Sequence, residues 1–569
     1  MRLYQRTEAS RGRPSPREVS QSYASVRAQP RETLRGPWGQ IGENMLRQYI
    51  ASPAFVVALI AGHLAGEPPT SASDRIVEDG NLALCFGDAN ADGRVDLTDL
   101  SSVLFRFGEL CALKLQLHPH RDLTHSYTFS GDNAGDQLGF SVGAAGDVNN
   151  DGFPDFIVGA PYNDHSGVDN GSAHVFSGRD GSVLFDFYGD TMNGGFGWSV
   201  SAAGDVNADG HDDVVVGAPF ANGSARGGTY VLSGADGSML FKLVGESAGD
   251  NFGWSVDGAG DVNQDGFDDI IIGIPLDDEH GDASGSAIVV SGRDGSTLYT
   301  LRGNVDGDEF GISVSAVGDI NNDGFADVVV GAHASDGHGA SSGSARVFSG
   351  ADGAVIYTFE GDSAGDRFGI SVSSAGDVDG DGVTDIIVGA HFDDNNGDES
   401  GSARVFSGID GSMLFTLEGD GERDFFGYSV SGAGDVNDDG FADVIVGAYD
   451  DDNNGVDSGS ARVFLGPNGA VLCTFVGDSP SDFFGNSVSG AGDVNNDGYA
   501  DLIVGALGDD NNGTYCGSAR LIVSGSLSPC IGDANGDGLI DLEDLNAVLA
   551  AFGTKCSEYA EKLAARIEQ

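Results

Sequence analysis

Short runs of apolar and small residues, separated by polar turns, recur in a fixed order along most of the chain. In the clearest copy, residues 429–434 read SVSGAG, residues 442–448 read ADVIVGA, residues 460–465 read SARVFL and residues 470–476 read AVLCTFV. Runs of this length that are rich in β-branched residues and bounded by Gly are typical of strands. The pattern predicts four short antiparallel strands in each unit, the second of them apolar enough to be buried on both faces.

The four-strand unit occurs seven times. Its first polar loop begins at Asp147, Asp205, Asp261, Asp319, Asp377, Asp435 and Asp493, with a spacing of 58 residues at every step except one of 56. Four-stranded units with a period above about 40 residues are typical of β-propeller blades. We therefore predict an all-β fold, a seven-bladed β-propeller over residues 125–525.

The two ends of the repeat array predict how the ring closes. Residues 125–131 read HSYTFSG and match the fourth strand of the other units, whereas the last unit stops after its third strand at residues 517–525. A strand contributed from the N-terminal side would complete the last blade and remove its open edge. We expect the propeller to be closed by this N-terminal strand.

The loop between the first two strands of each unit follows the pattern D-x-[DN]-x-D-G-x-x-D. Its polar side chains at positions 1, 3, 5 and 9 and the backbone carbonyl of position 7 form an oxygen-only ligand set, and Gly at position 6 permits the sharp turn. Such a set suits Ca²⁺, which takes six to eight oxygens, better than Mg²⁺. An EF-hand would need a carboxylate at position 12, where these loops have Val or Ile.

The sequence therefore predicts about seven Ca²⁺ ions in the propeller loops. The predicted ligands, with position 7 contributing its carbonyl oxygen, are Asp147, Asn149, Asp151, Phe153 and Asp155; Asp205, Asn207, Asp209, His211 and Asp213; Asp261, Asn263, Asp265, Phe267 and Asp269; Asp319, Asn321, Asp323, Phe325 and Asp327; Asp377, Asp379, Asp381, Val383 and Asp385; Asp435, Asn437, Asp439, Phe441 and Asp443; and Asp493, Asn495, Asp497, Tyr499 and Asp501.

Two further loops, at residues 85–111 and 530–556, do carry a carboxylate at position 12 and are followed by apolar residues at helical spacing. These EF-hand-like loop–helix modules predict two more Ca²⁺ ions. Their predicted ligands are Asp88, Asn90, Asp92, Arg94 (carbonyl), Asp96 and Asp99, and Asp533, Asn535, Asp537, Leu539 (carbonyl), Asp541 and Asp544. Each module is bounded by two Cys, which in a secreted protein predicts one disulfide each, Cys85–Cys111 and Cys530–Cys556.

The two modules resemble the calcium-binding repeats of type I dockerins, which implies a cohesin-like partner. A dockerin carries its two repeats in close tandem, whereas these begin 445 residues apart, at Asp88 and Asp533. Either the two halves pair beside the closed ring or they remain separate. Both arrangements stay open from sequence.

The N-terminal region changes character at Met45. Residues 1–44 are Arg-rich without periodicity and are interpreted as a disordered or non-native leader, and residues 45–66 have the charged start, apolar middle and small residues of a signal peptide. The alternative is a buried or interfacial helix. Residues 67–84 and 112–124 are interpreted as linkers and residues 557–569 as a tail, so we expect a protein that is secreted or at the cell surface.

Composition narrows the possible partners of the 569-residue chain. The formal net charge of −60 would repel a polyanion and argues against a nucleic-acid partner. Gly, at 91 residues, is about twice as common as usual because each unit uses it in turns, and not because the chain has low complexity. We expect any membrane contact to go through a surface partner.

The repeat pattern FG…DxNxDGxxDxxVGAP resembles the FG-GAP repeat of the integrin α-subunit propeller and its bacterial relatives. The FG pair occurs, for example, at Phe426-Gly427 and Phe484-Gly485, and GAP at residues 159–161 and 217–219. This resemblance implies an adhesion or ligand-binding module that takes an extracellular protein or polysaccharide ligand on the face opposite the calcium loops. The alternative is that the long acidic loops of that face, such as residues 391–400 and 449–458, are simply solvated or form extra cation sites.

An enzyme is the rival class, because FG-GAP and dockerin-like modules also accompany secreted polysaccharide-degrading enzymes. Two G-x-S-x-G strings, at residues 139–143 and 339–343, lack the strand–turn–helix context of a nucleophile elbow. We therefore predict no catalytic residue and no enzyme. The alternative is a component of a polysaccharide-degrading system, as an accessory protein or as a hydrolase or lyase that uses a carboxylate pair.

Overall fold

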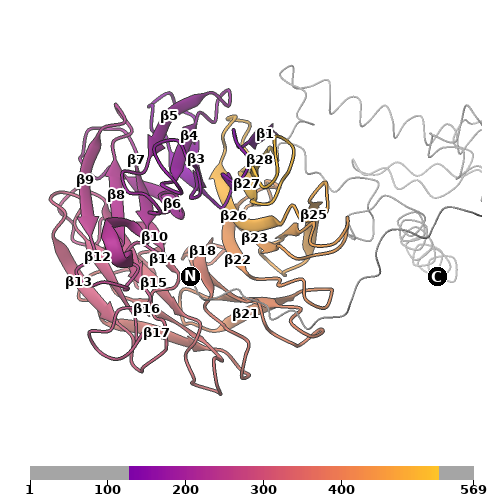
Figure 1. Ribbon diagram of the computed structural model, residues 1–569. Coiled ribbons are helices and arrows are strands. Elements are labelled where there is room, and N and C mark those ends of the chain that lie inside the picture. The colour runs from indigo at the N-terminus through magenta and orange to yellow at the C-terminus, as the bar shows by residue number, and fades with distance from the viewer. Residues whose placement is uncertain (1–126, 525–569) are drawn as a thin grey trace, which may run out of the picture. The chain divides into compact units, whose positions relative to one another are not determined.

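The computed structural model describes residues 127–524, which form seven four-stranded antiparallel sheets around a common centre (Figure 1). Blade I is β2 (Ser141–Gly146), β3 (Asp155–Ala160), β4 (Ser172–Phe176) and β5 (Val183–Tyr188). Blade II is β6 (Ser199–Gly204), β7 (Asp213–Ala218), β8 (Gly228–Leu232) and β9 (Met239–Val244). Blade III is β10 (Val256–Gly260), β11 (Asp269–Ile274), β12 (Ser286–Val290) and β13 (Thr297–Arg302).

The remaining blades repeat this order. Blade IV is β14 (Val314–Gly318), β15 (Asp327–Ala332), β16 (Ser344–Phe348) and β17 (Val355–Glu360), and blade V is β18 (Ser371–Gly376), β19 (Asp385–Ala390), β20 (Ser402–Phe406) and β21 (Met413–Glu418). Blade VI is β22 (Ser429–Gly434), β23 (Asp443–Ala448), β24 (Ser460–Phe464) and β25 (Val471–Val476). Blade VII is β26 (Phe484–Gly492), β27 (Asp501–Ala506), β28 (Ser518–Ile522) and the N-terminal β1 (Tyr127–Ser130). The predicted all-β seven-bladed propeller is confirmed.

The closure by the N-terminal strand is confirmed as well. β1 pairs antiparallel with β28, with Thr128 opposite Arg520 and Phe129 opposite Ala519. Phe129 also packs on the next blade, with ring centroids 5.3 Å from Phe156 and 4.5 Å from Phe176. The first strand in the sequence therefore joins the last blade to the first.

The innermost strands form the inner wall of the ring, and each contacts the innermost strands of both neighbouring blades. The recurring Ser-Val pair at their start explains how they are joined. In all seven blades the backbone N–H of the Val donates to the Ser hydroxyl of the preceding blade at 3.0 or 3.1 Å, as Val430 does to Ser371. The hydroxyl satisfies a backbone donor that would otherwise be buried without a partner.

The core lies between the blades. Every residue of the seven second strands is buried, which confirms the prediction made from their apolar runs. Within residues 127–524 seven apolar clusters occur, one at each blade-to-blade interface, and Phe368 and Phe426 of the FG pairs belong to two of them. Each blade is thus held chiefly by its neighbours, as expected for a repeat that cannot bury its faces alone.

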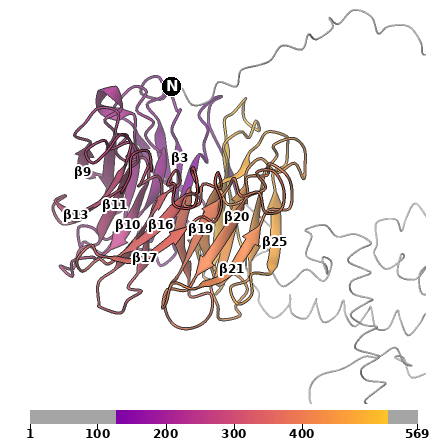
Figure 2. The same ribbon diagram turned by 90° about the horizontal axis from the view of Figure 1, so that it is seen from below.

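The loops gather on two opposite faces of the ring, which Figure 2 shows edge-on. The acidic-loop face carries the loops between the first and second strands and the turns between the third and fourth, such as residues 435–442 and 465–470 in blade VI. The linker face carries the loops between the second and third strands and the blade-to-blade linkers, such as residues 449–459 and 477–483. This division positions every candidate site described below.

Almost no helix occurs in the described part of the chain, where a single π-type turn spans Ala221–Ala225. None of the described helical residues forms a segment long and apolar enough to cross a membrane. The leader at 1–44, the signal peptide at 45–66 and the two EF-hand-like modules at 85–111 and 530–556 lie outside the described residues, as do the disulfides predicted for those modules.

Candidate functional site

Each acidic loop is folded around its first carboxylate. In blade VI, Asp435 accepts hydrogen bonds from the backbone N–H groups of Asp439 at 3.1 Å and Gly440 at 2.8 Å, and the carboxylate of Asp439 accepts one from Phe441 at 3.0 Å. Gly440 has a φ of +90°, which favours glycine at this position. Five other loops repeat the two bonds to the position 1 carboxylate. In the fifth loop, the backbone N–H of Gly380, at position 4, donates to Asp377 in place of the N–H at position 5, and that of Gly382 donates as in the other loops.

The position 9 aspartate is the first residue of each second strand and is fully buried. Asp443 accepts hydrogen bonds from the N–H of Val436, in the same loop, and of Gly466, in the turn after the third strand, at 3.2 and 3.1 Å. All seven loops have this pair of bonds. The side chain therefore connects the acidic loop to the turn that follows the third strand of the same blade.

Burial raises the pKa of these position 9 carboxyls, and the charges of positions 1, 3 or 5 add to the effect. The pKa rises to about 7 at Asp155, Asp213, Asp269, Asp443 and Asp501 and to about 6 at Asp327 and Asp385. An ionised carboxylate at this position is thus unfavourable unless a positive charge lies close to it.

Several oxygens at the predicted ligand positions are buried without a donor. They are Asn149 Oδ1, Asn207 Oδ1, Asn437 Oδ1, Asn495 Oδ1 and Asp497 Oδ2, at positions 3 and 5 of four loops. In the fifth loop, carboxylate oxygens of Asp377, Asp379 and Asp385 all lie within 4.8 Å of one another. Buried acceptors normally have partners, so the loops bring together an oxygen set that fits a hard cation such as Ca²⁺.

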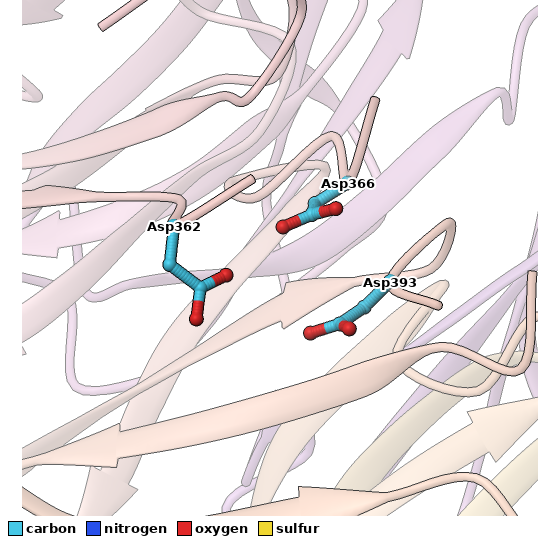
Figure 3. A group of neighbouring side chains, drawn as sticks. All are labelled: Asp362, Asp366 and Asp393. Carbon is cyan, nitrogen blue, oxygen red and sulfur yellow. The ribbon is translucent and has the colours of Figure 1, made fainter. Parts of the chain in front are cut away.

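A second set of carboxylates lies on the linker face, and its gathering into clusters was not predicted from the sequence. Asp362 and Asp366 lie in the linker before blade V, and Asp393 lies in the loop after β19; Figure 3 shows the three side chains gathered together. Arg404 of β20 donates to Asp362 Oδ1 at 2.7 Å and to Asp393 Oδ2 at 3.3 Å. The guanidinium already supplies a positive charge here, so the group fastens the linker to the third strand of the blade.

The same arrangement recurs in the next two blades. Asp420, Asp424 and Asp451 surround Arg462 in blade VI, and Arg520 reaches Asp478 in blade VII, beside Asp482 and Asp509. The sequence signal was the recurrence of GDSAGD, GDGERD and GDSPSD in the linkers. Only the folded chain shows that a carboxylate from a separate loop and an Arg from the third strand join them.

The two linker carboxylates of one cluster titrate in opposite directions. Burial raises the pKa of Asp366 to about 7, and its hydrogen bond with Asp362 and the charge of Asp393 act in the same direction. Burial would also raise the pKa of Asp362, but the hydrogen bond and charge of Arg404 lower it below its ordinary value. Asp366 therefore takes up a proton as the pH falls through about 7, while Asp362 stays ionised.

We predict that Asp366→Asn raises the melting temperature relative to wild type at pH 8, and that this gain shrinks as the pH falls below 7, to about half by pH 5.5. With a folded pKa of about 7 against an ordinary value of 3.8, wild type takes up a proton on folding between pH 7 and about pH 4, so its stability rises on acidification through that window. Asp362→Asn is the matched control and is expected to lower the melting temperature at pH 8. Melts at equal calcium measure both, and a pH-independent difference between Asp366→Asn and wild type would contradict the prediction.

Aromatic side chains gather on the linker face in two groups, which we call the aromatic surface. The first group is Phe140, Tyr162, Trp198, Phe220 and Trp254, and the second is Phe392, Phe425, Tyr428, Tyr449 and Phe483. Ring centroids of Trp198 and Trp254 are 4.9 Å apart, and those of Tyr428 and Tyr449 are 4.6 Å apart.

The aromatic surface is open to solvent, although it is large and apolar. Its members are partly exposed, Tyr162 to 36% and Tyr428 to 39%, and Arg367 stacks on Phe392 at 4.8 Å. Most of these aromatic residues come shortly after the FG pair or the GA pair of their repeat. Residues at the same position of successive repeats are 56 or 58 residues apart in the sequence, and the ring places them next to each other. Clustered exposed aromatic residues are typical of protein interaction surfaces.

Comparison with known proteins identifies the repeat. The FG-GAP repeat matches residues 139–176, 196–232, 252–291, 310–348, 368–406, 426–464 and 484–518. The chain is 34% identical over 240 residues to integrin alpha-5 of Xenopus laevis, which covers 38% of this chain and 22% of that protein. It is 30% identical over 216 residues to integrin alpha-V of Gallus gallus, covering 35% of this chain and 20% of that protein.

These matches cover about a fifth of the integrin chains. Among solved structures, the crystal structure of BBS1N in complex with ARL6DN, soaked with lead, aligns at a TM-score of 0.44 and 10% identity over 69% of this chain and 94% of that one. Residues 127–524 are therefore a seven-bladed β-propeller built from FG-GAP repeats, with sequence similarity to integrin alpha chains.

Proposed function

We propose that this chain is an extracellular adhesion or ligand-binding protein whose propeller is stabilised by calcium and binds its ligand on the linker face. The aromatic surface is the observation that carries the proposal. Ten partly exposed aromatic side chains from five blades and their linkers lie on one face, while the opposite face is occupied by the acidic loops. An apolar patch of this extent supplies the aromatic anchors on which binding energy usually concentrates.

Calcium, in this proposal, stabilises the propeller and does not contact the ligand. Each acidic loop would hold one ion through its carboxylates at positions 1, 5 and 9, its position 3 side chain and its position 7 carbonyl, which gives about seven ions in the ring. The positive charge of the ion would stabilise the ionised form of the position 9 carboxyls, whose pKa burial raises. The ion would also bind the buried oxygens that have no hydrogen-bond donor. Extracellular calcium, at millimolar concentration, would keep such sites filled.

The finer assignments rest on sequence. A signal peptide at 45–66 would direct the chain to the cell surface or the medium, the loops at 85–111 and 530–556 would add two calcium ions, and their dockerin-like pattern would offer a cohesin-like protein a second contact. The ligand of the propeller is an extracellular protein or polysaccharide, with nucleic acid disfavoured by the charge of −60.

The test is a binding screen of the full chain against extracellular proteins and polysaccharides, with calcium and with chelator. For a ligand that binds, Trp198→Ala and Tyr449→Ala probe the two groups of the aromatic surface, and we expect at least one to weaken binding about thirtyfold, the effect of a 2 kcal/mol hot spot. Tyr127→Ala, an exposed aromatic at the acidic-loop end of the outer strand β1, is the matched control and should change nothing.

Two results would count against this proposal. Binding that survives both substitutions would place the ligand elsewhere, provided that calcium-loaded variants melt like wild type. Release of soluble products from a polysaccharide would instead support the hydrolase or lyase alternative.

A further inference from the structure

The acidic loops of neighbouring blades contact each other at seven equivalent places. At each of them, the Gly that precedes a position 1 aspartate lies against the position 8 side chain of the next loop, and we call this contact the seat and the position 8 residue the seat residue. A Cβ added at Gly146 would lie 2.6 Å from Asp212 Cβ, and one at Gly376 would lie 2.5 Å from Ala442 Cβ. The close approach and the positive φ of these glycines explain why no side chain occurs there.

The residue that fills the seat differs from blade to blade. In five cases that residue carries no charge: Pro154, Ala326, Thr384, Ala442 and Ala500. In two cases it is a carboxylate that reaches into the preceding loop. Asp212 accepts a hydrogen bond from the backbone N–H of Asp147 at 2.7 Å, and Asp268 accepts one from Asp205 at 2.9 Å.

Both donors, Asp147 and Asp205, are position 1 residues. The carboxylate of one blade therefore positions the first predicted ligand of the loop in the preceding blade. The first loop has two further cross-blade contacts. Asn150 Nδ2 donates to the carbonyl of Gly210 at 3.2 Å, a contact that Gln264 and Asn496 repeat in the third and seventh loops, and His211 Nδ1 lies 2.9 Å from the carbonyl oxygen of Val148. The unpartnered buried oxygens of Asn149 and Asn207 in the first two loops recur in the sixth and seventh. What sets the first two loops apart is therefore the carboxylate that a neighbouring blade adds to each.

We propose that the first and second loops bind calcium more tightly than the four loops that share Asn at position 3 but have an uncharged seat residue, with Asp212 and Asp268 as cross-blade positioning residues. This inference rests on the proposed calcium function. Calcium affinity depends on the number of nearby charges and on the rigidity of the site. One additional charge several ångströms from a divalent ion in a watery environment changes affinity on the order of tenfold.

The proposal is tested by exchanging the seat residues Asp212 and Thr384, which occupy equivalent positions. Asp212→Thr should lower the affinity of one tight site about tenfold, and Thr384→Asp should raise that of one weak site, the loop beginning at Asp319, by a similar factor. Asp212→Asn keeps an acceptor for Asp147 without the charge, and its site should fall between wild type and Asp212→Thr. Calorimetric calcium titration of the chelated full chain measures the changes, and circular dichroism of the calcium-loaded proteins checks folding.

The outcomes separate this inference from the proposed function. Calcium binding with affinities that neither exchange alters would overturn the cross-blade role and leave the calcium sites in place. Absence of calcium binding to the propeller would overturn both. Comparing variants, and not total counts, keeps the result independent of the two loops at 85–111 and 530–556.

Discussion

Removing calcium is expected to lower the melting temperature of the propeller by about 20 °C. If each of the seven loops is present at a hundred times its Kd, each ion contributes about 2.7 kcal/mol, or on the order of 20 kcal/mol together. A ring of roughly 400 residues unfolds with an entropy of about 0.8 kcal/mol per kelvin, which converts that energy into the stated shift. Without ions, the buried carboxylates at position 9 would also have to stay protonated or ionise at a cost.

Thermal melts in millimolar calcium and in excess chelator measure the effect. Magnesium at the same concentration is the control and should restore only part of the stability, since Mg²⁺ demands near-ideal octahedral geometry and an all-protein oxygen set suits the larger ion better. The variant Asp319→Ala should lose one bound ion and a small part of the shift, because the neighbouring blades still cover its faces. A shift of one or two degrees on chelation would show that calcium does not support the fold.

Disrupting the closing strand is expected to destabilise the ring far more than the same change in an interior blade. The double variant Thr128→Pro/Phe129→Pro places two prolines in β1, and because alternate residues of an antiparallel strand face its neighbour, at least one ladder hydrogen bond to β28 is lost. It also removes Phe129 from Phe156 and Phe176. Together we expect a cost of at least about 5 kcal/mol, from a buried aromatic and the broken ladder.

The matched control is Thr358→Pro/Phe359→Pro. In β17, Thr358 stands opposite Arg346 and Phe359 opposite Ala345, the same register as in β1 and β28. There the chain continues into the next blade, so the ring stays covalently joined on both sides of the lesion. Melts and light scattering compare the two. We expect association only for the β1 variant, whose β28 edge becomes unpaired; equal behaviour of both variants would mean that β1 does not lock the ring.

Much of this architecture follows from the sequence alone, because it is written in local patterns that repeat. The strand predicted at residues 429–434 is β22, and β23 begins at Asp443, one residue after its prediction. The difference arises because the position 9 aspartate both ends the acidic loop and starts the strand. Closure was predictable for the same reason, since β1 carries the pattern of a fourth strand that the last unit lacks.

What only the tertiary structure decided depends on residues that the ring brings together from distant positions. The cluster of Asp362, Asp366 and Asp393 joins a linker to a loop across a strand pair, and no local spacing indicates Arg404 as its partner. The aromatic surface draws on positions in different repeats, each unremarkable in its own unit. The contact of Asp212 with Asp147 joins residues 65 positions apart.

The physical reason is the same in each case. Strand pattern and loop chemistry act within a few residues, so a single repeat determines them. Contacts between blades depend on which side chains occupy equivalent positions in successive repeats, and they form only when the ring closes and each blade is packed against two neighbours. The sequence thus determined seven blades and seven acidic loops, and the closed ring decided how those loops and faces meet.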